Sequence, residues 1–297
     1  MTTQVIGIDL GGTAIKLGRF TSNGYCLKSL SVDTPQPATP SAVVAAIVDA
    51  ISIVDPHGNA VAIGVGTPGP CDAVGRIAKI AINLPQWRNV PLADILEAKV
   101  GKPVIIDNDA NCAGLGEAMW GAGRYYKNFI LLTLGTGVGG AIFLDGKLFT
   151  GSFGAAGELG LISLIPDGPQ CKSGNQGSLE QYTSAIAIRR RTGKEAADNG
   201  ALAKAGDAKA LNFWQEYGKD LGTGVTSLIY VLTPEAVVIG GGVSASFEFF
   251  LPSMKAEIER RVMPTSRVNL QIIKAQLGNG AGMLGAASLA FEKIVNG

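Results

Sequence analysis

The chain has 297 residues, of which 46% are hydrophobic and 16% are charged, against roughly 25% charged in an average soluble protein. This composition supports a sizeable core and excludes a disordered chain, because disorder needs low hydrophobicity and a high net charge. The 25 basic and 24 acidic residues leave a formal net charge of +1, which argues against a broad basic face for nucleic acid.

No apolar run approaches the roughly 18 residues of a membrane span, and the N-terminus has no basic segment typical of a signal peptide. The four cysteines are scattered without a CxxC pair, so we expect reduced thiols. These observations predict a soluble cytoplasmic protein. The single histidine, His57, lies in a turn-like DPHGN and is expected at the surface, so a general base here is expected to be a carboxylate.

The first third of the chain alternates predicted strands and helices, as α/β folds do. Strands are expected at 4–9, 14–20, 25–32, 60–66 and 103–109. Helices are expected at 42–54, with Ser41 as N-cap, and at 91–99 and 110–120.

The second part opens with another strand, glycine turn and strand, FILLTLGTGVGGAIFLDG, which is similar to the start of the chain. This repetition predicts two related α/β lobes with a boundary near Cys112. Helices are expected near 179–190, 207–232, 246–261 and 280–295, and strands at 236–242 and 269–275.

The first glycine motif is DLGGT at 9–13, where a carboxylate ends a buried strand. Glycines let backbone N–H groups approach an anion closely. Asp9 is a candidate for holding magnesium through water, because magnesium dehydrates reluctantly. The alternative is a tight β-turn in which Asp9 accepts a turn hydrogen bond.

The second motif, GTGVGG at 135–140, matches the dinucleotide pattern GxGxxG. That pattern must open a helix, whereas the following AIFLDGKL is typical of a strand. We therefore interpret it as a hairpin whose turn wraps phosphate, with a plain hairpin as the alternative. A third motif, GGG at 240–242, lies between a strand and a helix and leaves room for a ligand, or forms a crowded turn.

Together the three motifs resemble the phosphate-1, phosphate-2 and adenosine elements of the actin, Hsp70 and sugar-kinase superfamily. In detail the chain resembles the repressor, open reading frame and kinase (ROK) family, especially its glucokinases. The stretches that carry this resemblance run in order from Val5 to about Ala287: GIDLGGT, GVGTPGP, NLPQW, IDNDANCAGLGE, LGTGVGGA, GAAGELG, GNQGSLE and IGGGVS.

The resemblance implies an α/β fold, the two-lobed actin-like ATPase (ribonuclease H-like) sugar-kinase fold with a cleft between the lobes. Residues 1–112 and 281–297 would form the N-terminal lobe, and residues 113–280 the C-terminal lobe. It also implies a phosphotransferase that makes glucose 6-phosphate, with Mg²⁺ and either ATP or polyphosphate as phosphoryl donor. Family members are often homo-oligomers, so a dimer is expected.

The resemblance also assigns roles to particular residues. Asp109 would be the general base that takes the proton from the sugar 6-hydroxyl. The residues implied for hexose binding are Asn83, Asn108, Asp109, Glu158, Glu180 and Gly69. Those implied for donor binding are Asp9, Gly11, Gly12, Thr13, Thr136, Gly137, Gly241 and Gly242. Asp109 has an alternative role as a helix cap, and Glu158 and Glu180 as cap or surface carboxylates.

The chain departs from the family at its zinc motif, GELGH followed by CxCGxxGCxE. Leu161 stands at the histidine position, Ser173 and Ser178 stand at two cysteine positions, and only Cys171 remains. Since a structural zinc takes four N or S ligands, we predict that no structural zinc is bound. Leu161 also leaves the hexose selectivity open, because the family histidine helps to orient the sugar.

Zinc-free family members include polyphosphate-using glucokinases, and TPQPATP at 34–40 looks like a segment of those enzymes. A polyanionic donor needs basic residues, and the one compact cluster is Arg189–Arg191 with Lys194, which is otherwise a solvated helix face. We place ATP ahead of polyphosphate. Kinases for fructose, mannose or an N-acetylhexosamine remain alternatives. A sugar-sensing repressor is less favoured, because the first motif lies within ten residues of the start and leaves no room for a helix-turn-helix.

Overall fold

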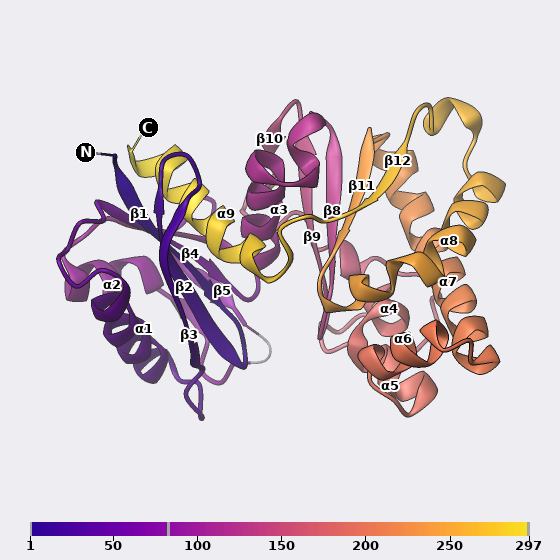
Figure 1. The fold of residues 1–297 in the computed structure, drawn as a ribbon, viewed down its shortest axis with the longest axis horizontal. Coiled ribbons are helices and arrows are strands. Elements are labelled where there is room, and N and C mark those ends of the chain that lie inside the picture. Colours follow the sequence, from indigo (N-terminus) through magenta and orange to yellow (C-terminus); the bar gives the residue numbers. More distant parts are fainter. Residues whose placement is uncertain (1, 82–83, 296–297) are drawn as a thin grey trace. The chain divides into compact units, whose positions relative to one another are not determined.

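The computed structural model describes residues 2–81 and 84–295 (Figure 1). The chain divides into two compact units. Unit 1 contains the described residues of Met1–Arg124, Leu148–Ala156 and Asn279–Gly297, and unit 2 contains Tyr125–Lys147 and Gly157–Gly278. The lobe boundary near Cys112 stays a prediction, and in the structure the helix around Cys112 belongs wholly to unit 1.

Unit 1 is built on a five-stranded sheet in the order β3-β2-β1-β4-β7. Its antiparallel strands are β1 (Gln4–Leu10), β2 (Ala14–Thr21) and β3 (Cys26–Asp33). β4 (Ala62–Thr67) and β7 (Val104–Asn108) run parallel to β1, which leaves β7 at one edge of the sheet. The short β5 (Ala78–Ile80) and β6 (Arg88–Val90) form a separate antiparallel pair.

Helices cover both faces of this sheet (Figure 1). On one face, α1 (Pro40–Val54) and α2 (Leu92–Val100) close the larger apolar core. On the other face, α9 (Ala281–Ala290) lies on β1 and β4 and packs against α3 (Asp109–Trp120). The approach of α9 is close enough that a Cβ at Gly64 would lie 1.8 Å from the Ala286 carbonyl oxygen. Glycine at this position therefore lets α9 pack directly on strand backbone.

Unit 2 repeats the sheet order, β10-β9-β8-β11-β12, which matches the first sheet strand for strand. Its strands are β8 (Phe129–Leu134), β9 (Val138–Leu144), β10 (Lys147–Leu148), β11 (Ala236–Gly240) and β12 (Gln271–Lys274). Its helices are α4 (Glu180–Thr183), α5 (Ala185–Thr192), α6 (Ala196–Lys204), α7 (Ala208–Leu232) and α8 (Phe247–Arg261). The repetition seen in the sequence is thus a repeated sheet.

Three local expectations differ from the structure. Thr39, not Ser41, caps α1, because Pro40 takes the first helical position and the Thr39 hydroxyl accepts from the Ala42 N–H at 3.4 Å. The helix expected over 179–190 is divided at Ser184, whose hydroxyl caps α5 by accepting from the Ala187 N–H at 3.1 Å. Helix α6 was not predicted. Among the described helices, none has the length and apolar character to cross a membrane.

Candidate functional site

The junction between β7 and α3 carries the central polar residues of unit 1. The Asn108 side chain is the N-cap of α3, where its Oδ1 accepts from the N–H groups of Ala110 at 2.9 Å and Asn111 at 3.2 Å. Its Nδ2 donates to the Gly69 carbonyl at 3.1 Å. Asn108 therefore takes the cap role considered for Asp109, which is the first residue of the helix.

Asp109 is half-buried, and one of its carboxylate oxygens accepts from the Ala110 N–H at 2.8 Å. Beneath it lie the buried thiols of Cys71 and Cys112, whose pKa values are raised well above the ordinary value, first by burial and then by nearby carboxylates that include Asp109. Both thiols therefore stay protonated near neutral pH.

A second carboxyl group, Asp107, braces the same turn from below. Its Oδ1 accepts from the Asn108 N–H at 2.7 Å and from the Asn111 amide at 2.9 Å. Burial raises the pKa of Asp107, and the hydrogen bonds from Asn111 and Asn108 partly oppose that rise. The Asp107–Asn111 segment is thus a hydrogen-bonded turn whose geometry is set by side chains at both ends.

The first glycine turn joins β1 to β2 and lies near this junction, since Asp9 is also among the carboxylates that raise the pKa of Cys112. The Gly11 N–H donates to the Ala14 carbonyl at 3.0 Å, and the Thr34 hydroxyl donates to the Gly11 carbonyl at 2.7 Å. At Gly12 a Cβ would meet nothing within 4 Å, so space lies open beside that backbone. The backbone of Thr13 is held by the Thr34 N–H at 2.9 Å.

Asp9 itself is partly buried at the end of β1. Burial raises the pKa of its carboxyl group, and the charge of Lys16, whose Nζ lies 3.8 Å from Oδ2, opposes that rise. On its other side, a Cβ at Gly282 would lie 2.8 Å from the Asp9 carboxyl carbon. A cation next to Asp9 would favour its ionised form.

In unit 2, the second glycine turn is attached to Glu180. Glu180 Oε2 accepts from the Val138 N–H at 2.9 Å, and a Cβ at Gly137 would lie 2.4 Å from the same oxygen. The Gly135 carbonyl accepts from the Ala185 N–H at 2.8 Å, which ties the turn to the start of α5. Thr136 is exposed at the tip of the turn.

Glu158 lies close to Glu180 in unit 2. The pKa of Glu158 is raised, mainly by burial and also by the negative charge of Glu180. The structure therefore brings together Glu158, Glu180 and the Thr136–Gly137 turn, which lie up to 44 residues apart in the sequence. Carboxylate oxygens are acceptors to which hydroxyl groups can donate.

The third glycine motif follows β11. Gly241 has φ +80°, and a Cβ there would lie 2.3 Å from the Leu134 carbonyl at the end of β8, so only glycine fits without strain. A Cβ at Gly242 would meet nothing within 4 Å, which leaves its backbone open to a ligand. Asn83, the remaining predicted hexose residue, lies outside the described residues.

Two positioning side chains were not predicted from the sequence. Thr34 holds the first glycine turn, and Arg76 joins its own turn to α2 and β7. A usable signal for Arg76 was the pair Asp94 and Glu97, spaced three residues apart on one face of a predicted helix. Arg189, Arg190 and Arg191 bind different partners, Glu195 at 2.9 Å, Gln181 at 2.9 Å and Asp220 at 2.8 Å, respectively, so two of the three arginines are paired with carboxylates.

Comparison with known proteins identifies the class. The ROK family model matches residues 5–293, so the chain belongs to the ROK family. Its fold is that of the two-lobed actin-like sugar kinases, as expected from the motifs.

Three relatives are informative. A Thermotoga maritima protein named glucokinase is 36% identical over 311 aligned positions, which cover 98% of each chain. The structure of a ROK family glucokinase from Streptomyces griseus in complex with glucose and AMPPNP is 35% identical, with a TM-score of 0.87 and coverage of 97% of this chain and 99% of that one. An inorganic polyphosphate/ATP-glucomannokinase from an Arthrobacter strain is 31% identical, with a TM-score of 0.72 and coverage of 98% and 99%.

The raised pKa of Glu158 predicts how the stability of the protein depends on pH. An ionised Glu158 costs stability above its folded-state pKa, and the cost is relieved as pH falls through that pKa toward the ordinary 4.5. The variant Glu158→Gln removes the cost. It should unfold about 2 °C or more above the wild type at pH 8, with a difference that shrinks toward pH 4.5.

Thermal unfolding followed by circular dichroism from pH 4.5 to 8 measures this difference. Glu259→Gln is the matched control, since Glu259 is exposed on α8 and its replacement should leave the unfolding temperature nearly unchanged at every pH. If Glu158→Gln does not raise the unfolding temperature at pH 8, or raises it equally at every pH, the raised pKa of Glu158 is contradicted.

Proposed function

We propose that this chain is a glucokinase, which transfers the terminal phosphoryl group of a donor to the 6-hydroxyl of glucose. The observation that carries the proposal is the placement of Asp109. It is the first residue of α3 and directly follows Asn108, whose side-chain amide is hydrogen-bonded through both its nitrogen and its oxygen. The names of the relatives at 35–36% identity over nearly the whole chain support this reaction.

In this proposal Asp109 is the general base. As the sugar 6-hydroxyl attacks the donor's terminal phosphorus, its proton passes to the Asp109 carboxylate and the bond from phosphorus to the leaving oxygen breaks. A base of this kind contributes about 10²- to 10⁴-fold to the rate. The rest of the catalysis is positioning and charge stabilisation, which is typical of phosphoryl transfer.

The hexose is proposed to bind Asn108, Gly69 and Asn83, together with Glu158 and Glu180. The Gly69 carbonyl takes one of the two N–H donors of the Asn108 amide. The two glutamates offer acceptors to sugar hydroxyls, and a protonated Glu158 would also be a donor. Hexose recognition needs several such groups pointing at one ligand.

The donor's phosphates are proposed to lie against the two glycine turns, with Gly241 and Gly242 beside the rest of the donor. The open backbone at Gly12 and the side chain of Thr13 supply the first turn, and the exposed Thr136 with Gly137 supplies the second. Asp9 fits a role beside magnesium, because a single partly buried carboxylate suits an ion that keeps most of its waters. Magnesium would neutralise charge on the phosphates.

We propose ATP as the main donor. A chain of phosphates needs a continuous row of basic side chains. The one compact basic cluster of the sequence does not supply it, because each of its arginines is bonded to a different side chain of the same protein. Arg191 is held further by Phe213, whose ring centre lies 5.2 Å from the guanidinium carbon. Because one relative is named a polyphosphate/ATP-glucomannokinase, polyphosphate is the alternative donor to test and mannose is the alternative acceptor. The dimer stays a prediction.

The proposal predicts the substrates directly. Initial rates with saturating Mg²⁺ and either ATP or polyphosphate, against glucose, mannose, fructose and N-acetylmannosamine, should give the highest kcat/KM for glucose with ATP. A preference for another hexose would replace glucose in the proposal, and a higher kcat/KM with polyphosphate would replace ATP. No transfer to any hexose from either donor would refute the kinase assignment.

We also propose that the loop after Glu158 is held without zinc. Cys171 Sγ donates to Glu180 Oε1 at 3.9 Å, and the Asn175 amide donates to the Leu161 carbonyl at 2.8 Å. Leu161 and Ser173 provide no zinc-binding nitrogen or thiolate at the family positions. Hydrogen bonds therefore take the place of a metal crosslink.

Elemental analysis of the purified, untagged protein should find well under one zinc per chain, and dialysis against a chelator should leave the unfolding temperature unchanged. Stoichiometric zinc that survives dialysis would overturn this part of the proposal.

A further inference from the structure

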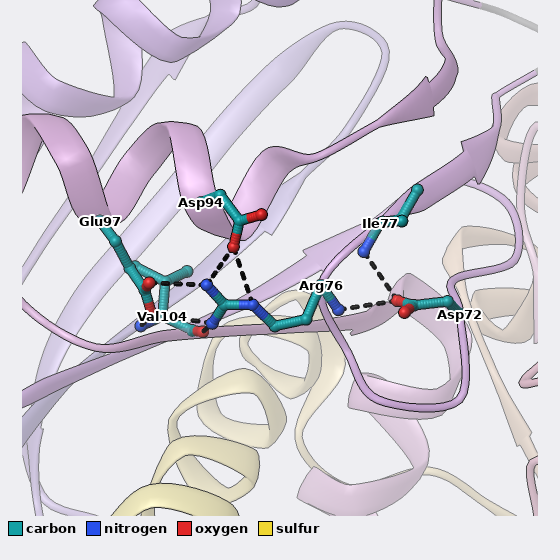
Figure 2. A network of polar contacts seen from close by, with 6 residues as sticks. All are labelled: Asp72, Arg76, Ile77, Asp94, Glu97 and Val104. Atoms are coloured by element: carbon teal, nitrogen blue, oxygen red, sulfur yellow. Dashed lines mark hydrogen bonds and ion pairs between the residues drawn. The ribbon is translucent and has the colours of Figure 1, made fainter.

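Arg76 lies at the centre of a polar network behind the edge strand β7 (Figure 2). Its Nε donates to Asp94 Oδ1 at 3.0 Å, and its two terminal nitrogens donate to the two oxygens of Glu97 at 2.8 and 2.6 Å. The same guanidinium donates to the Val104 carbonyl at 2.8 Å. Glu97 Oε1 also accepts from the Val104 N–H at 2.8 Å, so the network joins α2 to the first residue of β7.

Arg76 belongs to a tight turn that is itself braced. Asp72 Oδ1 accepts from the N–H groups of Arg76 and Ile77, both at 2.7 Å, as Figure 2 shows. The Asp72 N–H donates to the Ile77 carbonyl at 3.0 Å, and the Lys79 N–H donates to the Pro70 carbonyl at 3.0 Å. Residues 69–79 are therefore one hydrogen-bonded segment, which we call the edge hairpin.

The edge hairpin is fixed to β7 at three alternate residues. Arg76 binds the Val104 carbonyl, the Gly75 carbonyl accepts from the Ile106 N–H at 3.0 Å, and the Gly69 carbonyl accepts from the Asn108 amide at 3.1 Å. The backbone groups of alternate strand residues point to the same edge, so the contacts to Val104 and Ile106 place the edge hairpin along the edge of β7 that no other described strand occupies, while the contact to Asn108 is to its side chain. The far end of this attachment is the Asn108 amide.

We propose that Arg76 is a positioning residue for hexose binding, acting through the edge hairpin on Gly69 and Asn108. This inference rests on the proposed function, because it assigns the sugar to the Asn108 amide. A guanidinium that binds both oxygens of Glu97 and one oxygen of Asp94 holds its geometry more strictly than a lysine ammonium would. Without the Arg76 bond, the edge hairpin is attached to β7 through the Gly75 and Gly69 carbonyls, and the Gly69 carbonyl, although still bonded to Asn108, is held less rigidly.

The alternative is that Arg76 only stabilises unit 1. Its carboxylate partners are partly exposed, with 60% of the Asp94 side chain and 32% of the Glu97 side chain accessible to solvent. An isolated ion pair with this exposure contributes little to folding, whereas a bidentate network contributes more. Arg76→Met is therefore expected to lower the stability of unit 1 as well, and the effect that separates the two roles is on glucose binding, where a small displacement of a hydrogen-bonding group is costly.

The test compares Arg76→Met with Arg19→Met. Arg19 forms another tight arginine–carboxylate pair of unit 1, with Asp55 Oδ1 at 2.9 Å, at the end of α1 rather than at the edge of β7. Arg76→Met should raise the glucose KM, and the glucose Kd measured by calorimetry without donor, by about 10-fold. Its donor KM should stay within about twofold, and Arg19→Met should leave both glucose values near wild type.

A double-mutant cycle with Asn108→Ala makes the test specific. If Arg76 acts through Asn108, adding Arg76→Met to Asn108→Ala should change the glucose Kd by much less than 10-fold. Full additivity of the two effects, or a glucose Kd in Arg76→Met equal to that of Arg19→Met, would overturn the proposal. Where Arg76→Met does not fold, Arg76→Lys with the same measurements decides, with an intermediate rise in glucose Kd expected.

The two proposals fail in different ways. A wild-type protein that neither binds nor phosphorylates glucose refutes the proposed function. An active wild type whose Arg76 variants bind glucose normally refutes only the positioning role.

Discussion

The site in unit 1 depends on one side chain, the amide of Asn108. Its oxygen caps α3 through the Ala110 and Asn111 N–H groups, while its nitrogen holds the Gly69 carbonyl. One planar group at the end of β7 is therefore bonded both to the start of α3 and to the loop carrying Gly69. Asp109 follows directly in the chain, so its position is set by the backbone that Asn108 holds. A cap of this kind contributes roughly 1 kcal/mol to stability, which is modest beside its effect on geometry.

In unit 2, as in unit 1, one side chain serves two parts of the site. The carboxylate of Glu180 accepts from the Val138 N–H and lies where a Cβ at Gly137 would stand, so a sugar-binding candidate and a phosphate-turn candidate share one contact. The neighbouring Glu158 is partly buried and its pKa is raised, so its ionised form destabilises the folded protein. Unfavourable burial of an ionisable group is typical of functional sites, since natural proteins tolerate such costs where a ligand needs the group.

Much of this architecture could be predicted from the sequence, because the pattern of strand, glycine turn and strand occurs twice and the apolar runs have clear lengths. The position of Asp109 at a strand–helix junction followed from the change of pattern after Ile106. Contacts between segments that are distant in the sequence could not be predicted. Examples are the contact of Glu180 with the second glycine turn and that of Arg76 with β7. The helix caps were also ambiguous, since Thr39 and Ser41 lie two residues apart, Asn108 and Asp109 are adjacent, and the members of each pair have similar capping propensity. The roles of Glu158 and Glu180 came from family resemblance alone.

The most direct test of the central claim is the variant Asp109→Asn, measured for both turnover and sugar binding. An asparagine there keeps an oxygen for the Ala110 N–H and nearly the same shape, but it cannot take a proton from the sugar hydroxyl. We predict that kcat falls by about 10²-fold or more while the calorimetric Kd for glucose changes by no more than about threefold. A kcat within tenfold of the wild type, in a protein that binds glucose normally, would contradict the assignment of Asp109 as the base.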